Sequence, residues 1–280
     1  MGKVAIALFL GAAGCEAVAG IHDVTLATDA SVDTFTTDSP LAETSVNDTA
    51  DAVSETPPGK CASERGPSMV EIATGGKSFC IDATEVTNSQ FDEYSKLPGA
   101  PPTLPVRCKD VVLTFPGKTG LDNAPQFNVS WCDAFAFCAW AGKRLCRSLD
   151  TAQPIASDNS EWTYVCTQGK TTAYPYGNSY DPKACVNGRT ATTATPEPVA
   201  SFGNCTGITP PYTEVYDLSG NVSEWVDECT GTSCRALGGY FGDTDIKALQ
   251  CASINSGTGM TVVQPVGTIL SGLGFRCCRD

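Results

Sequence analysis

The fifteen cysteines of this 280-residue chain limit what it can fold into more than any other feature. Fourteen of them fall between Cys61 and Cys278, and no two have the C-x-x-C spacing of a zinc site. A chain this rich in cysteine and without zinc spacing is typical of an oxidising compartment, where thiols pair. The sequence therefore predicts one disulfide-rich domain over residues 61–280, and we expect it to be monomeric.

Charge and histidine content exclude several functions. Acidic residues number 31 against 18 basic ones, for a net charge of −13. Nucleic-acid affinity depends on Lys and Arg side chains that neutralise phosphate, so we expect no nucleic-acid partner. The single histidine, His22, also excludes metal sites that need two or three imidazoles.

The first fifteen residues read as an export signal. Lys3 precedes an unbroken apolar run, Val4–Leu10, which is too short to span a bilayer. The run ends at Ala12-Ala13-Gly14-Cys15, which resembles a bacterial lipobox with alanine where leucine is usual. We expect lipidation of Cys15 and a place in the bacterial cell envelope, facing the periplasm or the exterior, with the lipid as the only membrane contact. The alternative is an ordinary signal peptide cleaved nearby.

Residues 16–60 differ in composition from the rest of the chain. From Asp23 to Lys60 there are eight acidic residues and eight threonines, with Phe35 as the only aromatic residue. Such a stretch buries too little apolar surface to offset its ordering entropy. We interpret it as a disordered acidic tether. The alternative, an acidic extension without a tether role, applies if Cys15 is not lipidated.

Local signals within residues 61–280 predict sparse helix and short strands, an α+β pattern with much irregular structure. Capping boxes predict helices that begin after Thr87 and after Ser130, and a third, weaker helix is expected over residues 158–168. Strands are expected at Lys77–Asp82 and Gly274–Cys278.

Six sequence blocks, in a fixed order, resemble the formylglycine-generating enzyme (sulfatase-modifying factor) family over residues 68–280. The blocks are Phe79–Asn88, Asn128–Leu145, Tyr174–Gly177, Asp217–Trp225, Leu237–Gly239 and Gly274–Cys277. Each block alone is a weak signal, but six in order are specific. The resemblance implies a C-type-lectin-like formylglycine-generating-enzyme fold. It also implies the family's reaction, in which a cysteine in a sulfatase C-x-P-x-R segment is oxidised to formylglycine with oxygen and copper(I).

The copper ligands of the family are two thiolates, which suit a soft ion. In this sequence the corresponding positions fall near Asp243 and Ala248 when counted from Gly239, and at Phe241 and Ile246 when counted back from Cys251. None of the four is a cysteine. We therefore expect no copper and no catalytic residues of this type. The alternative is an oxidase whose ligands lie elsewhere in the chain.

A second metal site of the family is better matched. The segment Asp217–Trp225 resembles its calcium loop, and Ca²⁺ prefers hard oxygen ligands. We expect a structural calcium ion held by the carboxylates of Asp217 and Glu224 and by the carbonyls of Gly220 and Val222. The alternative is a tight turn with two solvated carboxylates.

The resemblance also implies two disulfides, Cys138 with Cys277 and Cys166 with Cys251. Cys229 and Cys234 are close enough in sequence to pair locally, and Cys146 is a candidate partner for Cys278. The hypothesis for function is a non-catalytic module, supported by calcium, that binds an extended peptide or a glycan. Its ligand groove is expected to have Tyr240, Phe241, Asp243 and Asp245 on its floor.

Overall fold

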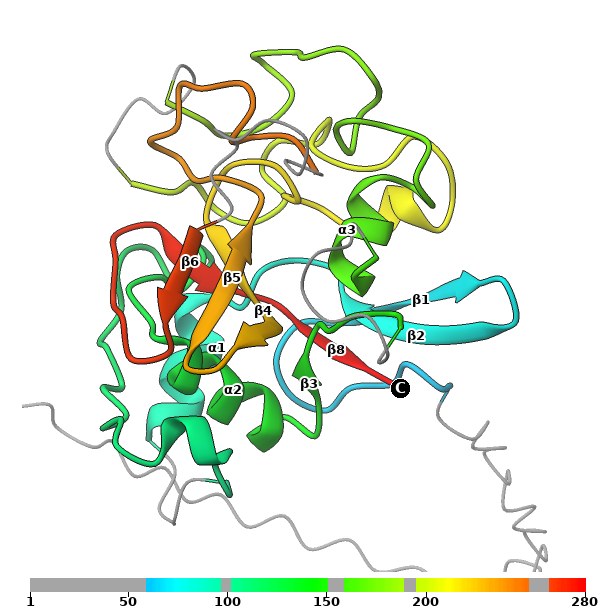
Figure 1. Ribbon diagram of the computed structural model, residues 1–280. Coiled ribbons are helices and arrows are strands. Elements are labelled where there is room, and N and C mark those ends of the chain that lie inside the picture. The colour runs from blue at the N-terminus through cyan, green and yellow to red at the C-terminus, as the bar shows by residue number, and fades with distance from the viewer. Residues whose placement is uncertain (1–58, 97–101, 151–158, 189–194, 252–261) are drawn as a thin grey trace, which may run out of the picture. The chain divides into compact units, whose positions relative to one another are not determined.

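A computed structural model describes residues 59–96, 102–150, 159–188, 195–251 and 262–280 (Figure 1). All of them belong to one unit, residues 55–280. The predictions for the export signal, Cys15 and nearly all of the tether lie outside the described residues. No helix within the described ranges has the length and apolar composition needed to cross a membrane.

The described chain is α+β with much irregular structure, as predicted (Figure 1). Its α-helices are α1 (Asn88–Ser95), α2 (Trp131–Trp140) and α3 (Glu161–Cys166), and its 3₁₀ helices are η1 (Val106–Cys108) and η2 (Tyr212–Glu214). Its strands are β1 (Met69–Thr74), β2 (Lys77–Asp82), β3 (Arg144–Leu145), β4 (Ser223–Thr230), β5 (Ser233–Leu237), β6 (Val262–Pro265), β7 (Leu273–Phe275) and β8 (Cys277–Arg279).

The helices begin where the capping signals predict. Thr87 and Ser130 each accept a hydrogen bond from the backbone amide three residues later, and the side chains of Gln90 and Asp133 return the bond. The third helix is shorter than expected, because Ser160 caps it and it ends at Cys166. Local hydrogen bonding thus fixes all three helix starts.

The strands form two four-stranded sheets, with orders β1-β2-β8-β3 and β6-β5-β4-β7. The prediction of one strand over Gly274–Cys278 is wrong, because the chain leaves one sheet and enters the other at Arg276. Before it, β7 runs parallel to β4; after it, β8 runs antiparallel to β2 and β3. Arg276 therefore stands at the junction of the two sheets.

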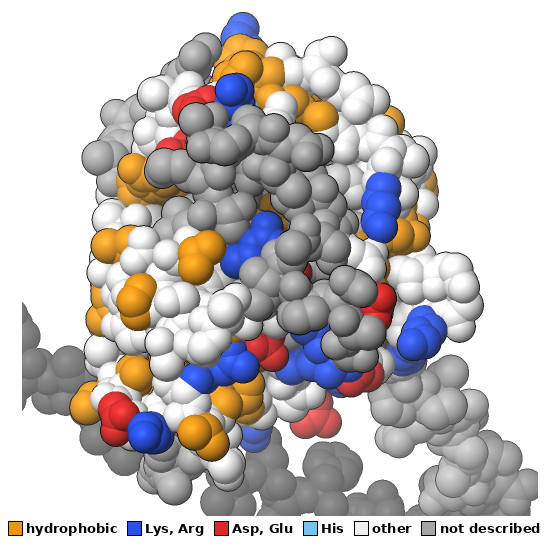
Figure 2. All heavy atoms as spheres, in the orientation of Figure 1, with side chains coloured by type: hydrophobic (Ala, Val, Ile, Leu, Met, Phe, Trp, Pro, Cys, Tyr) orange, Lys and Arg blue, Asp and Glu red, His pale blue; other side chains and the backbone are white. Residues whose placement is uncertain are grey.

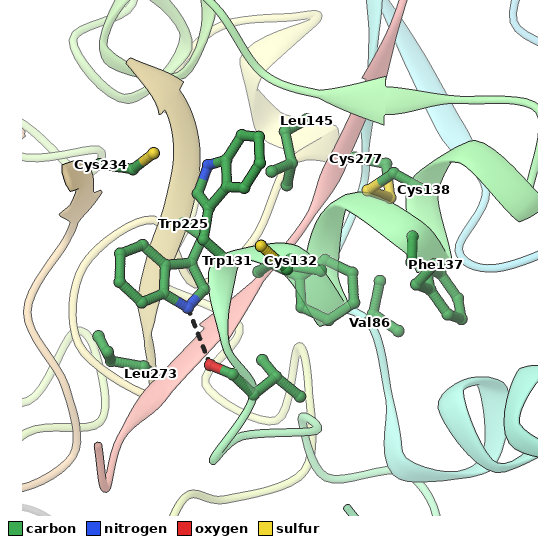
Figure 3. Packing of buried hydrophobic residues seen from close by; sticks show 14 of the residues in the cluster. Val86, Trp131, Cys132, Phe137, Cys138, Leu145, Trp225, Cys234, Leu273 and Cys277 are labelled. Carbon is green, nitrogen blue, oxygen red and sulfur yellow. Dashed lines mark hydrogen bonds between the residues drawn. A yellow bond between two sulfur atoms is a disulfide. The ribbon is translucent and has the colours of Figure 1, made fainter. Parts of the chain in front are cut away.

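The largest core cluster lies between α1, α2 and the sheet of β4, β5 and β7. Trp131 and Trp225 are buried in it, and each indole N–H donates to a backbone carbonyl, of Val226 and Val129 respectively. Figure 3 shows the Trp225 bond and places Cys234 at the edge of this cluster. Because buried indole donors need partners, these bonds fix the position of α2 on the sheet.

Seven disulfides join all fourteen cysteines of residues 61–280. The structure pairs Cys138 with Cys277 and Cys166 with Cys251, as the resemblance implies, over separations of 139 and 85 residues. The other five bridges are Cys61–Cys80, Cys108–Cys132, Cys146–Cys278, Cys185–Cys205 and Cys229–Cys234. Bridges that close long loops remove the most entropy from the unfolded chain.

Candidate functional site

The segment Gly238–Cys251 follows β5 and carries the residues predicted to line a ligand groove. It begins with two glycines in left-handed conformations, with φ of +94° at Gly238 and +70° at Gly239. A side chain at Gly239 would lie 2.9 Å from the Ala248 carbonyl oxygen. The glycine pair therefore lets the start of this segment contact its own end.

Asp243 closes a tight turn in this segment. Its Oδ2 atom accepts a hydrogen bond from the Tyr240 amide at 2.9 Å, and its own amide donates to the Tyr240 carbonyl at 2.9 Å. Burial raises the pKa of Asp243. The hydrogen bond from the Tyr240 amide lowers this pKa in part, and the nearby Asp245 carboxylate raises it further. Asp245 makes a similar local bond to the Lys247 amide. Both carboxylates thus shape the turn.

Tyr240 and Phe241 point in different directions. Tyr240 is half-buried, and its ring packs against the backbone of Gly272, where a Cβ atom would lie 2.4 Å from the ring. Phe241 is only 5% exposed and packs edge-on against Phe127. Phe241 is therefore a core residue and not part of a groove floor, and of these two rings only that of Tyr240 is available to a ligand.

The end of the segment is tied to the rest of the domain. Ala248 is buried, the Leu249 carbonyl accepts from the Ser219 hydroxyl at 2.8 Å, and Cys251 is bridged to Cys166. The Tyr174 hydroxyl donates to the Ile246 carbonyl at 3.2 Å. These bonds hold Asp243 and Ala248, the positions predicted to correspond to the copper thiolates, within a defined loop.

The chemistry of this loop does not suit copper(I). Asp243 offers only hard oxygen and Ala248 offers no ligand atom. Every cysteine of residues 61–280 is in a disulfide, so the described residues contain no thiol for a cuprous ion. The residues present therefore do not fit the family's copper site.

A second feature is a buried ionic cluster around Arg276. Arg276 is 1% exposed and forms a two-pronged bond to Glu224, with N–O distances of 2.6 and 2.7 Å. Its remaining donors reach the carbonyls of Asp82 and Tyr216. Glu224 also accepts from the Trp162 indole at 2.9 Å. One arginine thus connects both sheets and the tryptophan of α3.

Two further carboxylates share this cluster. Asp217 accepts from the Ala200 amide at 2.6 Å, and Glu85 accepts from Asn221 and the Val222 amide. Burial raises the pKa of Asp217 to about 6. Burial and the charges of Asp217 and Glu224 raise the pKa of Glu85 well above its ordinary value. Three carboxylates therefore face one guanidinium within the protein interior.

This arrangement bears on the predicted calcium ligands. Glu224 does not fit the role assigned to it, because both of its oxygens are held by Arg276. Among the described residues, no Lys or Arg side chain donates to Asp217 or to Glu85. Asp217 and Glu85 are thus the carboxyl groups of this cluster without a bonded cation in that part of the chain, and calcium binding stays a prediction.

The sequence analysis did not single out Glu85 or Arg276. Both lie within sequence blocks that carry the family resemblance. Membership of such a block was the only sequence signal that could have pointed to them. Their roles depend on contacts with residues far away in the sequence, since Arg276 meets Glu224 across 52 residues and Asn221 meets Glu85 across 136.

A family model described as the sulfatase-modifying factor enzyme 1-like domain matches residues 39–280 of this chain. The chain belongs to this family, and the predicted formylglycine-generating-enzyme fold is confirmed. The match begins 22 residues before Cys61, the predicted start of the domain.

Curated relatives include both active and inactive members. The chain is 32% identical to the formylglycine-generating enzyme of Bos taurus over 119 residues, 41% of this chain and 29% of that protein. It is 29% identical to the inactive C-alpha-formylglycine-generating enzyme 2 of Bos taurus over 163 residues, 55% of this chain and 49% of that protein. The chain thus spans half or less of the length of these relatives.

Among solved structures, the chain resembles PvdO from Pseudomonas aeruginosa, with a TM-score of 0.49 and 23% identity. The comparison covers 74% of this chain and 82% of PvdO.

Proposed function

We propose that the domain is a non-catalytic member of the sulfatase-modifying factor family that binds an extended peptide. The observation that carries this proposal is the state of its sulfur atoms. The fourteen cysteines are all used as cross-links, and the two thiolate positions carry Asp243 and Ala248. The Arg276–Glu224 pair is formed next to this loop, and the Bos taurus relative that matches 55% of this chain is named as inactive.

The surface of the loop supports a ligand of mixed character. Tyr240 offers part of an aromatic ring, Ile246 is 40% exposed, and Asp245 and Lys247 are exposed charges of opposite sign. In Figure 2, hydrophobic side chains, Lys or Arg side chains and Asp or Glu side chains lie close together at the top of the drawn face, the end of the molecule at which Figure 1 draws the chain after β5. A peptide, which presents both backbone polar groups and side chains, matches such a surface.

A direct assay tests the absence of catalysis. A C-x-P-x-R peptide is incubated with the protein and oxygen, with and without copper, and aldehyde is measured by mass spectrometry. We expect no aldehyde in either condition, while an active formylglycine-generating enzyme run in parallel produces it. Copper-dependent turnover by this chain would show that it is an oxidase whose ligands lie outside the positions we assign.

Binding is tested with the same peptide carrying a fluorophore. We expect saturable binding by anisotropy, weakened at least tenfold in Tyr240→Ala and unchanged in Leu121→Ala, a matched substitution at a site 65% exposed elsewhere. Binding of acidic and neutral oligosaccharides in place of the peptide would assign the loop to glycans. Equal binding by the Tyr240→Ala and Leu121→Ala proteins would mean that the ligand binds outside this loop.

We also propose that a calcium ion supports the fold at the buried carboxylates. The proximity of the Asp217 and Glu85 carboxyl groups, to which no described Lys or Arg side chain donates, supports this, since a divalent cation neutralises two carboxylates. A ligand that binds only the folded state adds about 2.7 kcal/mol to stability at one hundred times its dissociation constant. We expect calcium to raise the melting temperature of the wild type and not that of Asp217→Asn. Equal shifts in both proteins would exclude this site.

Lipid anchoring at Cys15 is the remaining part of the proposal. It is supported by the apolar run before Ala12-Ala13-Gly14-Cys15. We expect the exported protein to fractionate with membranes and Cys15→Ala to release it. Release of the wild type into the soluble fraction would favour ordinary signal cleavage.

A further inference from the structure

Of the seven disulfides, Cys229–Cys234 contributes least to the framework. It joins adjacent ends of β4 and β5 over a separation of 5 residues, whereas the next shortest spans 19. Short loops lose little entropy when they are closed. The hairpin is also held by strand pairing and by the buried ion pair of Arg235 with Glu228, at 2.6 Å. The fold therefore does not depend on this bond.

This disulfide is also accessible from one side. Cys229 is half-buried and precedes an exposed turn, while Cys234 is fully buried. The turn and η1 border a cleft of about 450 Å³ that is lined by Arg107, Gly231 and Thr232, among others. Cys61 of the Cys61–Cys80 bridge is the only other half-buried cysteine among the described residues.

The two sulfur atoms have opposite electrostatic surroundings. The Arg107 guanidinium lies 3.8 Å from Cys234 Sγ, and a carboxylate oxygen of Asp227 lies 3.7 Å from Cys229 Sγ. A nearby cation stabilises a thiolate and a nearby carboxylate destabilises one. Among the described residues, no Lys or Arg donates to a sulfur of Cys61–Cys80. Of the four sulfur atoms in these two partly exposed bridges, Cys234 Sγ is the one that the described residues place against a guanidinium.

We propose that Cys229–Cys234 is an exchange-active disulfide that accepts two electrons from a dithiol. A thiolate of the dithiol bonds to Cys229 Sγ, the Cys229–Cys234 bond breaks, and its electron pair leaves on Cys234 Sγ beside Arg107. The second thiol of the dithiol loses its proton to solvent and attacks its own partner sulfur. Cys229 then leaves as a thiolate and takes a proton from solvent, so that the dithiol ends as a disulfide and this chain as the Cys229 thiol and the Cys234 thiolate.

Arg107 acts on this reaction through the leaving group. A leaving thiol of lower pKa departs faster, and one pKa unit with a Brønsted sensitivity of about 0.5 corresponds to about threefold in rate. Asp227 acts in the opposite sense, because its carboxylate repels an approaching thiolate and competes for Arg107. Arg107 and the partial exposure of Cys229 thus favour attack at Cys229 with departure of Cys234, and Asp227 slows that attack.

The test is a time course of reduction of the full-length protein by limiting dithiothreitol at neutral pH. Thiols are trapped by alkylation and located by peptide mass spectrometry. We expect Cys229 and Cys234 to be labelled first, at least tenfold faster than Cys61 and Cys80, while the far-ultraviolet spectrum stays native. Equal rates for the two bridges, or labelling only on unfolding, would overturn the proposal without any variant.

Variants of Arg107 and Asp227 test whether their charges, and not only the exposure of Cys229, set the rate of reduction. We expect Arg107→Gln to slow labelling of Cys229 and Cys234 about threefold, Arg107→Lys to restore it, and Asp227→Asn to increase it. The rate of Cys61–Cys80 serves as the internal reference in each protein. Because Arg107 also packs over the Trp131 ring at 5.3 Å, the melting temperature of each variant is measured in parallel. No change of rate in a folded Arg107→Gln protein would contradict the assigned role.

Discussion

The surroundings of Arg276 and the segment Gly238–Cys251 are held in place by different kinds of interaction. Around Arg276, charged side chains from both sheets meet in the interior, with almost no exposed surface. In the segment, backbone turns, one disulfide and a few hydroxyl bonds fix a loop whose residues Gly242 and Thr244–Lys247 are exposed. The first region stabilises the fold and the second presents a surface.

On the proposal that this domain has no copper ligands, the difference explains how the family fold persists. The segment contributes few buried charges, so a residue such as Asp243 at a thiolate position would disturb the sheets little. Arg276 differs, because its replacement would leave the carboxylates of Glu224, Asp217 and Glu85 buried together. We therefore expect sequence change to be tolerated in the loop and not in the cluster.

The largest expected effect follows from this contrast. Arg276→Met removes the cation that neutralises Glu224, and breaking a buried ion pair costs about 5 kcal/mol. Urea denaturation measures the loss. Arg147→Gln is the matched control, since its pair with Asp280 is 42% and 70% exposed and contributes little. Comparable losses in the two variants would mean that Arg276 has no special role.

The second effect concerns the disulfide that anchors the segment. Replacing both Cys166 and Cys251 with alanine opens a loop of 85 residues, which the chain-entropy model values at about 4 kcal/mol. We expect urea denaturation to show this loss, with a smaller one for the double replacement of Cys229 and Cys234. A larger loss at the hairpin would reverse the ranking of the two bridges.

The local features of the fold were predictable from short motifs, and two long-range disulfides from the family resemblance, but the other long-range contacts were not. Thr87 and Ser130 cap their helices through residues three positions away, so short motifs suffice. The strand break at Arg276 depends on Glu224, and no pattern near Arg276 reports it. Tyr240 and Phe241 are adjacent aromatic residues, and the second is buried by residues distant in sequence, Phe127, Val186 and Val222.

The third effect is a dependence of stability on pH. The folded-state pKa values of Asp217, at about 6, and of Glu85 lie above their unfolded values. The folded state therefore holds extra protons, and the resulting stability is complete below about pH 4 and is lost as the pH rises through about 6.

We expect the free energy of unfolding, measured in a calcium chelator, to fall by about 2 kcal/mol from pH 5 to pH 7.5. Asp217→Asn reduces this slope, because its side chain does not titrate. Stability that rises over this interval would contradict the assignment.

The smallest effect lies in the loop. Asp243→Ala removes the acceptor for the Tyr240 amide and is expected to cost about 1 kcal/mol, whereas Asp243→Asn retains an acceptor and costs less. Differential scanning calorimetry resolves the two. If Asp243→Ala lowered the free energy of unfolding as much as Arg276→Met does, the loop would be as important to stability as the cluster around Arg276, which would contradict the comparison.

The central claim is that the cysteines of this domain are cross-links and not copper ligands. Alkylation of the unreduced protein under denaturing conditions, with peptide mapping of residues 61–280, tests it most directly. The account predicts no alkylated cysteine among the fourteen. Two free thiols in this region of the isolated protein would contradict it.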